Sequence, residues 1–286
     1  MSLDRNVPFA VHRPPQPTAV LYDSPHSGRY YPPDFKLGAP LSDLRRGEDA
    51  YVDELLLPSV EDGAMLLVNN YPRCYIDVNR AESDIDESQL AEPWSSELGQ
   101  LAPTEKSKRG LGLIRRYVVP GIEAQAGPLR VFEVRARLDG VYHPYHIALA
   151  DLVRRMHDAE GVVLHVDWHS MKSVGNAMTP DGPGARRSDF VVSDVHGRSA
   201  DPQLTELVVE SLRALGYTVS VNDPYAGGTI VQRTGAPPQG VHSIQVEINR
   251  ALYLDEIKVE KTDGFATLAN NLRELTRRLV AATLKP

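Results

Sequence analysis

A regular alternation of short apolar runs with helical patterns is the feature that most restricts how this chain can fold. The apolar runs that predict strands are 19–22, 64–68, 74–78, 162–166, 190–192, 217–221 and 244–248. Apolar residues at helical spacing predict helices within 52–60, 147–156, 204–215 and 268–280, and Gly161 is expected to end the second of these. This succession indicates an α/β fold around a mostly parallel sheet.

Length and composition are those of an ordinary globular protein. The chain has 286 residues, 42% of them hydrophobic and 24% charged, which argues against general disorder. Residues 82–108 are polar without a clear period and predict a long loop, and residues 174–187 and 222–240 are rich in turn formers. Because there is no repeat and no clear linker, we expect residues 1–286 to form a single domain.

Charge and cysteine content exclude several classes of protein. Lys and Arg total 31 against 38 Asp and Glu, a net charge of −7, which disfavours a nucleic-acid platform and an anionic-membrane binder. Cys74 stands alone, so an intramolecular disulfide and a cysteine-rich zinc site are excluded. No apolar run approaches the roughly 18 residues that span a bilayer, and residues 1–15 carry charges and prolines. We therefore expect a cytoplasmic protein, monomeric or a small homo-oligomer.

Polar side chains able to do chemistry follow four of the predicted strands. In open α/β sheets, ligands bind beyond the carboxyl ends of the strands, so these side chains are expected to share one cleft. They are His26 after the first strand, Asn79 and Arg80 after the third, Asp167 and His169 after the fourth, and Glu247 and Arg250 around the end of the last.

The histidines admit two interpretations. Asp167 and His169 are two apart on a strand and face the same side, so they could be a metal ligand with its orienting carboxylate or a plain hydrogen-bonded pair. His26 is followed by Ser27, but the Gly-x-Ser-x-Gly pattern of a nucleophile elbow is absent there. His-Glu-x-x-His is also absent, so a metal site would have to be assembled from distant segments.

Three further charged residues have a structural and a functional interpretation each. Asp49, just before a predicted helix, is either its N-cap or a carboxylate ligand beside two imidazoles. Arg80 either grips a substrate carboxylate through two parallel hydrogen bonds or forms a surface ion pair. Glu247 interrupts an apolar run and is either a general base or the structural partner of Arg250.

Together these segments resemble the N-formylglutamate amidohydrolase family. The matching pieces follow the family's order from about residue 24 to 255. They are residues 24–28, Asp49 ahead of 52–55, Arg73 with 77–80, Arg137 with 142–146, 167–171, 222–228 and 245–253. That family is similar in turn to the zinc carboxypeptidase and aspartoacylase group. The resemblance implies a three-layer α/β/α sandwich with a mixed, mostly parallel central sheet.

The resemblance also implies a metal site and the roles of its residues. One zinc ion would be held by His26, Asp49 and His169, with Glu247 as general base and Asp167 orienting His169. In the broader group a His and a Glu three residues apart often bind the metal together, whereas here Arg29 stands three residues after His26. The acidic ligand must therefore come from elsewhere, and Asp49 fits best, with Glu48 as its rival.

The implied activity is metal-dependent hydrolysis of the amide bond of N-formyl-L-glutamate or a related N-acyl amino acid. Arg137 would hold the oxyanion, and the small anionic substrate would be bound by Asn79, Arg80, Arg250 and backbone N–H groups at Gly227 and Gly228. One alternative is a carboxypeptidase-like or aspartoacylase-like hydrolase of another N-acyl amino acid or short peptide. The other is a ligand-binding protein without turnover.

Overall fold

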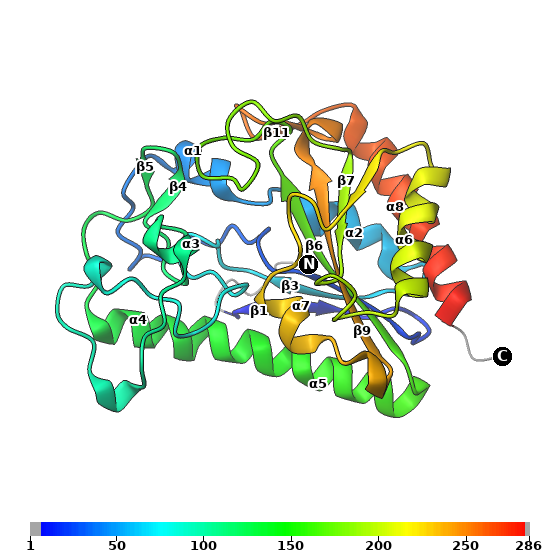
Figure 1. Ribbon diagram of the computed structural model, residues 1–286, viewed down its shortest axis with the longest axis horizontal. Helices are drawn as coiled ribbons and strands as arrows, with labels where there is room; N and C mark the ends of the chain where they lie inside the picture. The colour runs from blue at the N-terminus through cyan, green and yellow to red at the C-terminus, as the bar shows by residue number, and fades with distance from the viewer. Residues whose placement is uncertain (1–6, 284–286) are drawn as a thin grey trace.

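A seven-stranded sheet forms the centre of the computed structural model, which describes residues 7–283 (Figure 1). Its strand order is β1-β3-β2-β6-β9-β7-β8. The strands are β1 (Phe9–His12), β2 (Val20–Ser24), β3 (Met65–Asn69), β6 (Val163–Met171), β7 (Phe190–Ser193), β8 (Val219–Val221) and β9 (Val241–Asn249). The pairings β3–β2, β2–β6, β6–β9 and β7–β8 are parallel, whereas β1–β3 and β7–β9 are antiparallel. The sheet is therefore mixed and mostly parallel, as predicted.

Helices cover both faces of this sheet and complete the predicted three layers. Figure 1 shows α6 (Pro202–Ala214) and α8 (Gly264–Thr283) on one side, where α2 (Val52–Leu56) joins them in one hydrophobic core. The long helix α5 (His143–Glu160) packs with α4 (Val131–Arg137) in a second core on the other side. As predicted, Gly161 ends α5, in the left-handed conformation that suits glycine (φ 76°).

The smaller elements lie outside these layers or at the rim of the sheet. They are α1 (Leu41–Leu44), α3 (Glu105–Lys108), α7 (Thr229–Thr234) and two hairpins, β4 (Tyr117–Val119) with β5 (Ile122–Glu123) and β10 (Leu254–Asp255) with β11 (Glu260–Lys261). No helix within residues 7–283 combines the length and the apolarity needed to cross a membrane. Residues 1–6, the start of the N-terminal segment discussed above, lie outside the described range.

The two faces of the central strands differ in chemistry, and this difference positions the site. On β6, Leu164, Val166 and Trp168 point into the core under α2, α6 and α8. The alternate residues of β6, beginning with His165, point to the opposite face because side chains alternate along a strand. Asp167 and His169 therefore share one face, as predicted. β6 also runs five residues beyond the apolar stretch of 162–166, to Met171.

The prediction of a strand over residues 74–78 is wrong. This segment is a series of turns, although Cys74, Ile76 and Val78 are buried in the second core. Its backbone hydrogen bonds go to a neighbouring loop, for example from Asp77 N to Leu113 O at 2.9 Å. A short buried loop and a short strand have the same apolar composition, so the pattern alone could not separate them. Asn79 and Arg80 consequently follow a buried loop and not a strand.

Candidate metal and substrate site

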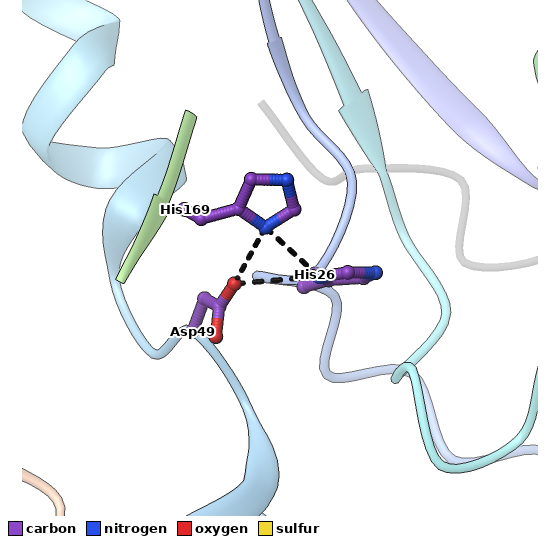
Figure 2. Close-up of side chains that lie close together, drawn as sticks. All are labelled: His26, Asp49 and His169. Atoms are coloured by element: carbon purple, nitrogen blue, oxygen red, sulfur yellow. Dashed lines mark hydrogen bonds and ion pairs between the residues drawn. The ribbon is translucent and has the colours of Figure 1, made fainter. Parts of the chain in front are cut away.

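Three side chains from distant segments converge at the carboxyl ends of the central strands (Figure 2). His26 follows β2, Asp49 precedes α2, and His169 lies on β6. The two Nδ1 atoms of His26 and His169 are 3.0 Å apart, and Asp49 Oδ2 lies 3.0 Å from His169 Nδ1 and 3.4 Å from His26 Nδ1. Tetrahedral zinc with bonds of about 2.0–2.1 Å separates its ligand atoms by about 3.4 Å, so this spacing is close to that of a zinc site.

The chemistry of the three inward atoms also fits a cation. The outward Nε2 of His26 lies 2.7 Å from Asp77 Oδ1, and Nε2 of His169 lies 2.9 Å from Asp167 Oδ1. An imidazole that donates its Nε2–H to a carboxylate carries a lone pair on Nδ1. His26 has this arrangement. His169 has it when its Nε2–H is directed to Asp167 and not to the Asn79 amide nitrogen 3.0 Å away, and a divalent cation then satisfies both Nδ1 atoms and the Asp49 oxygen.

Asp49 faces the two imidazoles and does not cap a helix. Its Oδ1 accepts a hydrogen bond from Arg250 Nη2 at 2.9 Å and lies 3.5 Å from Arg73 Nη1. Helix α2 begins after Tyr51 without a side-chain cap, so the N-cap interpretation is wrong. The rival Glu48 points elsewhere and accepts from Tyr31 Oη at 2.7 Å.

Asp77 supports this arrangement and was not predicted as a site residue. Besides His26, it accepts hydrogen bonds from Arg73 Nη2 and Arg115 Nε, both at 3.1 Å. Burial opposes its charge, but Arg73 and the neighbouring cations hold the pKa of Asp77 well below its ordinary value. A stable negative charge here fixes the orientation of the His26 ring. In the sequence, Arg73 stands four residues before Asp77, and both belong to the segments that resemble the family. This pair was the signal that could have identified Asp77 as a site residue.

Glu247 lies beside His169 as its register partner between the parallel strands β9 and β6. Its Oε1 accepts from Gln245 Nε2 at 3.0 Å, and burial raises its pKa. Within residues 7–283 no ion pair joins Glu247 to Arg250, so the structural-partner interpretation is wrong. Glu247 therefore lines the same cavity as His26 and His169, and its second carboxylate oxygen, Oε2, accepts no hydrogen bond from the described residues.

His26, His169 and Glu247 line a cavity of about 480 Å³, within the range of small-molecule sites. Its wall contains an unusual number of cationic side chains for a protein with a net charge of −7. They are Arg46, Arg73, Arg80, Lys106, Arg109, Arg115, Lys172, Arg187 and Arg250. Such a wall raises the local concentration of anions irrespective of the total charge.

The structure does not bring Arg137 to this cavity. Its guanidinium donates to Tyr75 O at 2.7 Å and stacks over the Tyr75 ring, 4.1 Å from the ring centre. It belongs to the second core, where its aliphatic stem and planar head pack against aromatic rings. The predicted oxyanion role of Arg137 is therefore wrong.

Gly227 and Gly228 line the cavity. Gly228 does not, however, offer its backbone N–H to a substrate as predicted. Its N–H is taken by Gln245 Oε1 at 2.7 Å and is not available to a substrate. A Cβ atom at position 228 would lie 2.4 Å from Asn79 Oδ1, so glycine is required by close packing.

Asn79 and Arg250 also line the cavity with their polar groups already engaged. The Asn79 amide contacts His169 Nε2 at 3.0 Å and accepts from Ile230 N at 2.9 Å. Arg250 donates to Asp49, to Ser170 Oγ at 3.0 Å and to Arg46 O at 3.1 Å. Both side chains therefore position the candidate metal ligands.

A buried polar network behind the site was missed altogether. Asp23 on β2 lies 3.0 Å from His165 Nε2 and accepts from Tyr145 Oη, and His165 Nδ1 lies 2.7 Å from Ser243 Oγ. Asp23, His165 and Ser243 have no exposed surface, so this Asp-His-Ser series cannot reach a substrate. It provides hydrogen bonds to polar groups on the buried face of the sheet.

The fold and the site together define a class: three-layer α/β/α proteins with a His-Asp-His candidate metal site at the carboxyl ends of parallel strands. A family model for N-formylglutamate amidohydrolase matches residues 18–254, and the chain belongs to this family. It is similar to the N-formylglutamate deformylase of Pseudomonas aeruginosa, with 29% identity over 93% of this chain and 91% of that protein.

A solved structure shows the same relationship. The crystal structure of N-formylglutamate amidohydrolase from Ralstonia eutropha JMP134 superposes with a TM-score of 0.89 and 38% identity, covering 97% of this chain and 98% of that one. A gene product from Agrobacterium tumefaciens has the same fold, with a TM-score of 0.68, 20% identity and coverage of 97% and 96%.

Proposed function

We propose that this chain, as a single catalytic domain of residues 1–286, hydrolyses the amide bond of N-formyl-L-glutamate with the help of one zinc ion. The observation that carries the proposal is the convergence of three acceptor atoms, from His26, Asp49 and His169, beside Glu247 in a basic cavity. Family membership supports the same substrate class.

Zinc bound to this set would supply a water of pKa about 7 and polarise the formyl oxygen. Glu247 takes a proton from the attacking water at its Oε2, the oxygen that Gln245 leaves free. The same carboxyl group then gives the proton to the departing amide nitrogen. Formate and glutamate leave, so one water is consumed for each C–N bond broken.

The remaining residues hold the reacting groups in place. Asp77 and Asp167 fix the two imidazole rings, and Arg250 fixes Asp49. Arg73 replaces Arg137 as the candidate for the oxyanion, because it lines the cavity and lies 3.5 Å from a carboxylate oxygen of Asp49.

Arg80 is the candidate for a substrate carboxylate. Its guanidinium donates only to backbone carbonyls, those of Leu111 at 2.9 Å and Asn79 at 2.8 Å. No carboxylate within residues 7–283 forms an ion pair with it, so its charge is available to a substrate.

The test measures formate release from N-formyl-L-glutamate by protein of known metal content. We expect formate and glutamate in equal amounts, loss of activity after chelation, and recovery on adding zinc. N-acetyl-L-glutamate, N-succinyl-L-glutamate and short peptides, assayed in parallel, test the alternative hydrolases. Saturable binding of N-formyl-L-glutamate without any formate release would refute the proposal and support the non-catalytic alternative.

A further inference from the structure

One wall of the cavity carries more positive charge than the described residues neutralise. The cations of this wall are Arg73, Arg80, Lys106, Arg109 and Arg115. The carboxylate of Asp77 contacts Arg73 and Arg115, and that of Glu105, which also lines the wall, is paired with Lys108 at 2.7 Å. Asp77 is itself shared by Arg73, Arg115 and His26. A buried cation without a full set of partners is unfavourable, and Arg115 is buried, whereas Lys106 is exposed and lines the cavity. An excess of positive charge of this kind indicates a site prepared for an anion.

Lys106 and Arg115 are two cations of this wall that have few partners among the described residues. The Lys106 ammonium has no hydrogen-bond or ion-pair partner within residues 7–283. Arg115 is 7% exposed and uses its Nε to contact Asp77, while its two terminal nitrogens have no hydrogen-bond partner in the described part of the chain. Five donor hydrogens of a guanidinium allow it to bind Asp77 and a ligand carboxylate together.

The electrostatics of these groups favour an anion beside them. Repulsion by Arg80 lowers the pKa of Lys106 to about 8. Burial and the charge of Arg73 lower the pKa of Arg115 to about 9. An anion beside both groups would relieve this repulsion.

The segment that carries the two residues is held firmly against the site. Leu113 N donates to Asp84 O at 2.8 Å, and Asp77 N donates to Leu113 O at 2.9 Å. Asp84 also accepts from Thr104 N at 2.7 Å, just before helix α3, on which Lys106 lies. The end of the long polar excursion of residues 82–108 is therefore an ordered part of the cavity wall.

The opposite wall is less suited to a second carboxylate. Arg187 donates two hydrogen bonds to Asp181, at 2.8 and 2.9 Å, and is neutralised by it. Arg250 is used by Asp49. Arg46 is ion-paired with Asp43 at 3.5 Å, and Lys172 remains as the competing cation without an ion pair among the described residues.

We propose that Lys106 and Arg115 form a subsite for the side-chain carboxylate of the substrate, which makes this chain selective for N-acyl derivatives of acidic amino acids. This inference rests on the proposed function for the position of the scissile bond. The α-carboxylate is then left to Arg80, so each carboxylate has its own cation.

The test compares N-formyl-L-glutamate with N-formyl-L-glutamine, which has nearly the same shape without the negative charge. For Lys106→Met we expect the ratio of the two kcat/KM values to fall roughly 10- to 100-fold, with the glutamine value almost unchanged. Lys106→Arg should restore most of the ratio. Arg115→Met should lower the ratio in the same direction, compared at equal metal content because Arg115 also contacts Asp77.

Two matched variants control the test. Lys36→Met removes an exposed lysine paired with Glu133 at 3.1 Å, neither of which lines the cavity, and should leave the ratio as in the wild type. Lys172→Met removes the competing cation of the opposite wall. If Lys172→Met lowers the ratio of the two kcat/KM values and Lys106→Met leaves it unchanged, the assignment of the subsite to Lys106 is overturned.

A binding measurement separates this inference from the proposed function. Calorimetric titration with glutarate and with butyrate compares a dicarboxylate with a monocarboxylate and needs no turnover. If the wild type prefers glutarate and Lys106→Met does not, the subsite stands even where no formate is released. If formate is released but Lys106→Met keeps both the substrate ratio and the glutarate preference, the subsite is refuted and the activity stands. Equal binding of both acids by the wild type also refutes the subsite.

Discussion

Replacement of Asp77 by Asn tests how far a residue outside the ligand set controls the metal site. The carboxylate accepts from His26 at 2.7 Å, from Arg73 and Arg115 at 3.1 Å, and from Asn79 N at 3.0 Å. An amide offers one oxygen to these donors. If that oxygen stays with the arginines, the amide NH₂ faces His26 Nε2 and forces the ring proton onto Nδ1, where it blocks the metal.

The expected magnitude follows from this change of tautomer. Loss of a carboxylate behind a metal-binding histidine lowers metal affinity about 10- to 100-fold, which corresponds to about 1.4–2.8 kcal/mol. The assay is competition for zinc with a chromophoric chelator, with total metal measured after dialysis. Asp84→Asn is the matched control, because Asp84 is equally buried but contacts Thr104 and no metal ligand. A zinc Kd for Asp77→Asn within twofold of the wild type would refute this reasoning.

Further predictions concern the proton-transfer group, the ligands, the buried network and the basic wall. Glu247→Gln should lower kcat for formate release by roughly 100-fold or more with metal retained, and near-normal turnover would remove Glu247 from its role. His169→Ala should lose the metal by elemental analysis, and full occupancy would contradict the ligand assignment. Tyr145→Phe removes the hydroxyl donor to the buried carboxylate of Asp23 and should lower the free energy of unfolding in urea by about 1.5–3 kcal/mol, whereas a change below about 0.5 kcal/mol would show the bond to be dispensable. Because the lowered pKa of Lys106 is about 8, its charge is present below that pH and lost above it, so kcat/KM for N-formyl-L-glutamate should fall above about pH 8. The profile for Lys106→Met should lack this fall, and identical profiles would contradict the assignment.

The parts of the fold that could be predicted are those with a strong local period. The apolar stretch before Asp167 and the helical spacing of residues 204–215 correspond to β6 and α6. Residues 74–78 could not be assigned because their burial comes from contacts with the second core and not from a strand pairing. Edge strand β1 and helix α4 were missed because short elements carry too few residues to show a period.

The site residues that could be predicted are likewise those marked by a local sequence pattern. His26, Asp49, His169 and Glu247 stand next to strand or helix ends, where reactive side chains of distant segments meet. Arg137 was misplaced because nothing local distinguishes an arginine stacked on tyrosine from one that faces a cavity. The carboxylate of Asp77 could not be given its role, because the role depends on the direction of a histidine ring 51 residues away.

The central claim is that His26, Asp49 and His169 share one divalent ion. Anomalous diffraction at the zinc absorption edge, from crystals of the zinc-loaded protein, tests it most directly. We expect one strong peak at about 2.0–2.2 Å from His26 Nδ1, His169 Nδ1 and a carboxylate oxygen of Asp49. A zinc peak elsewhere, or none between these three side chains, would contradict it.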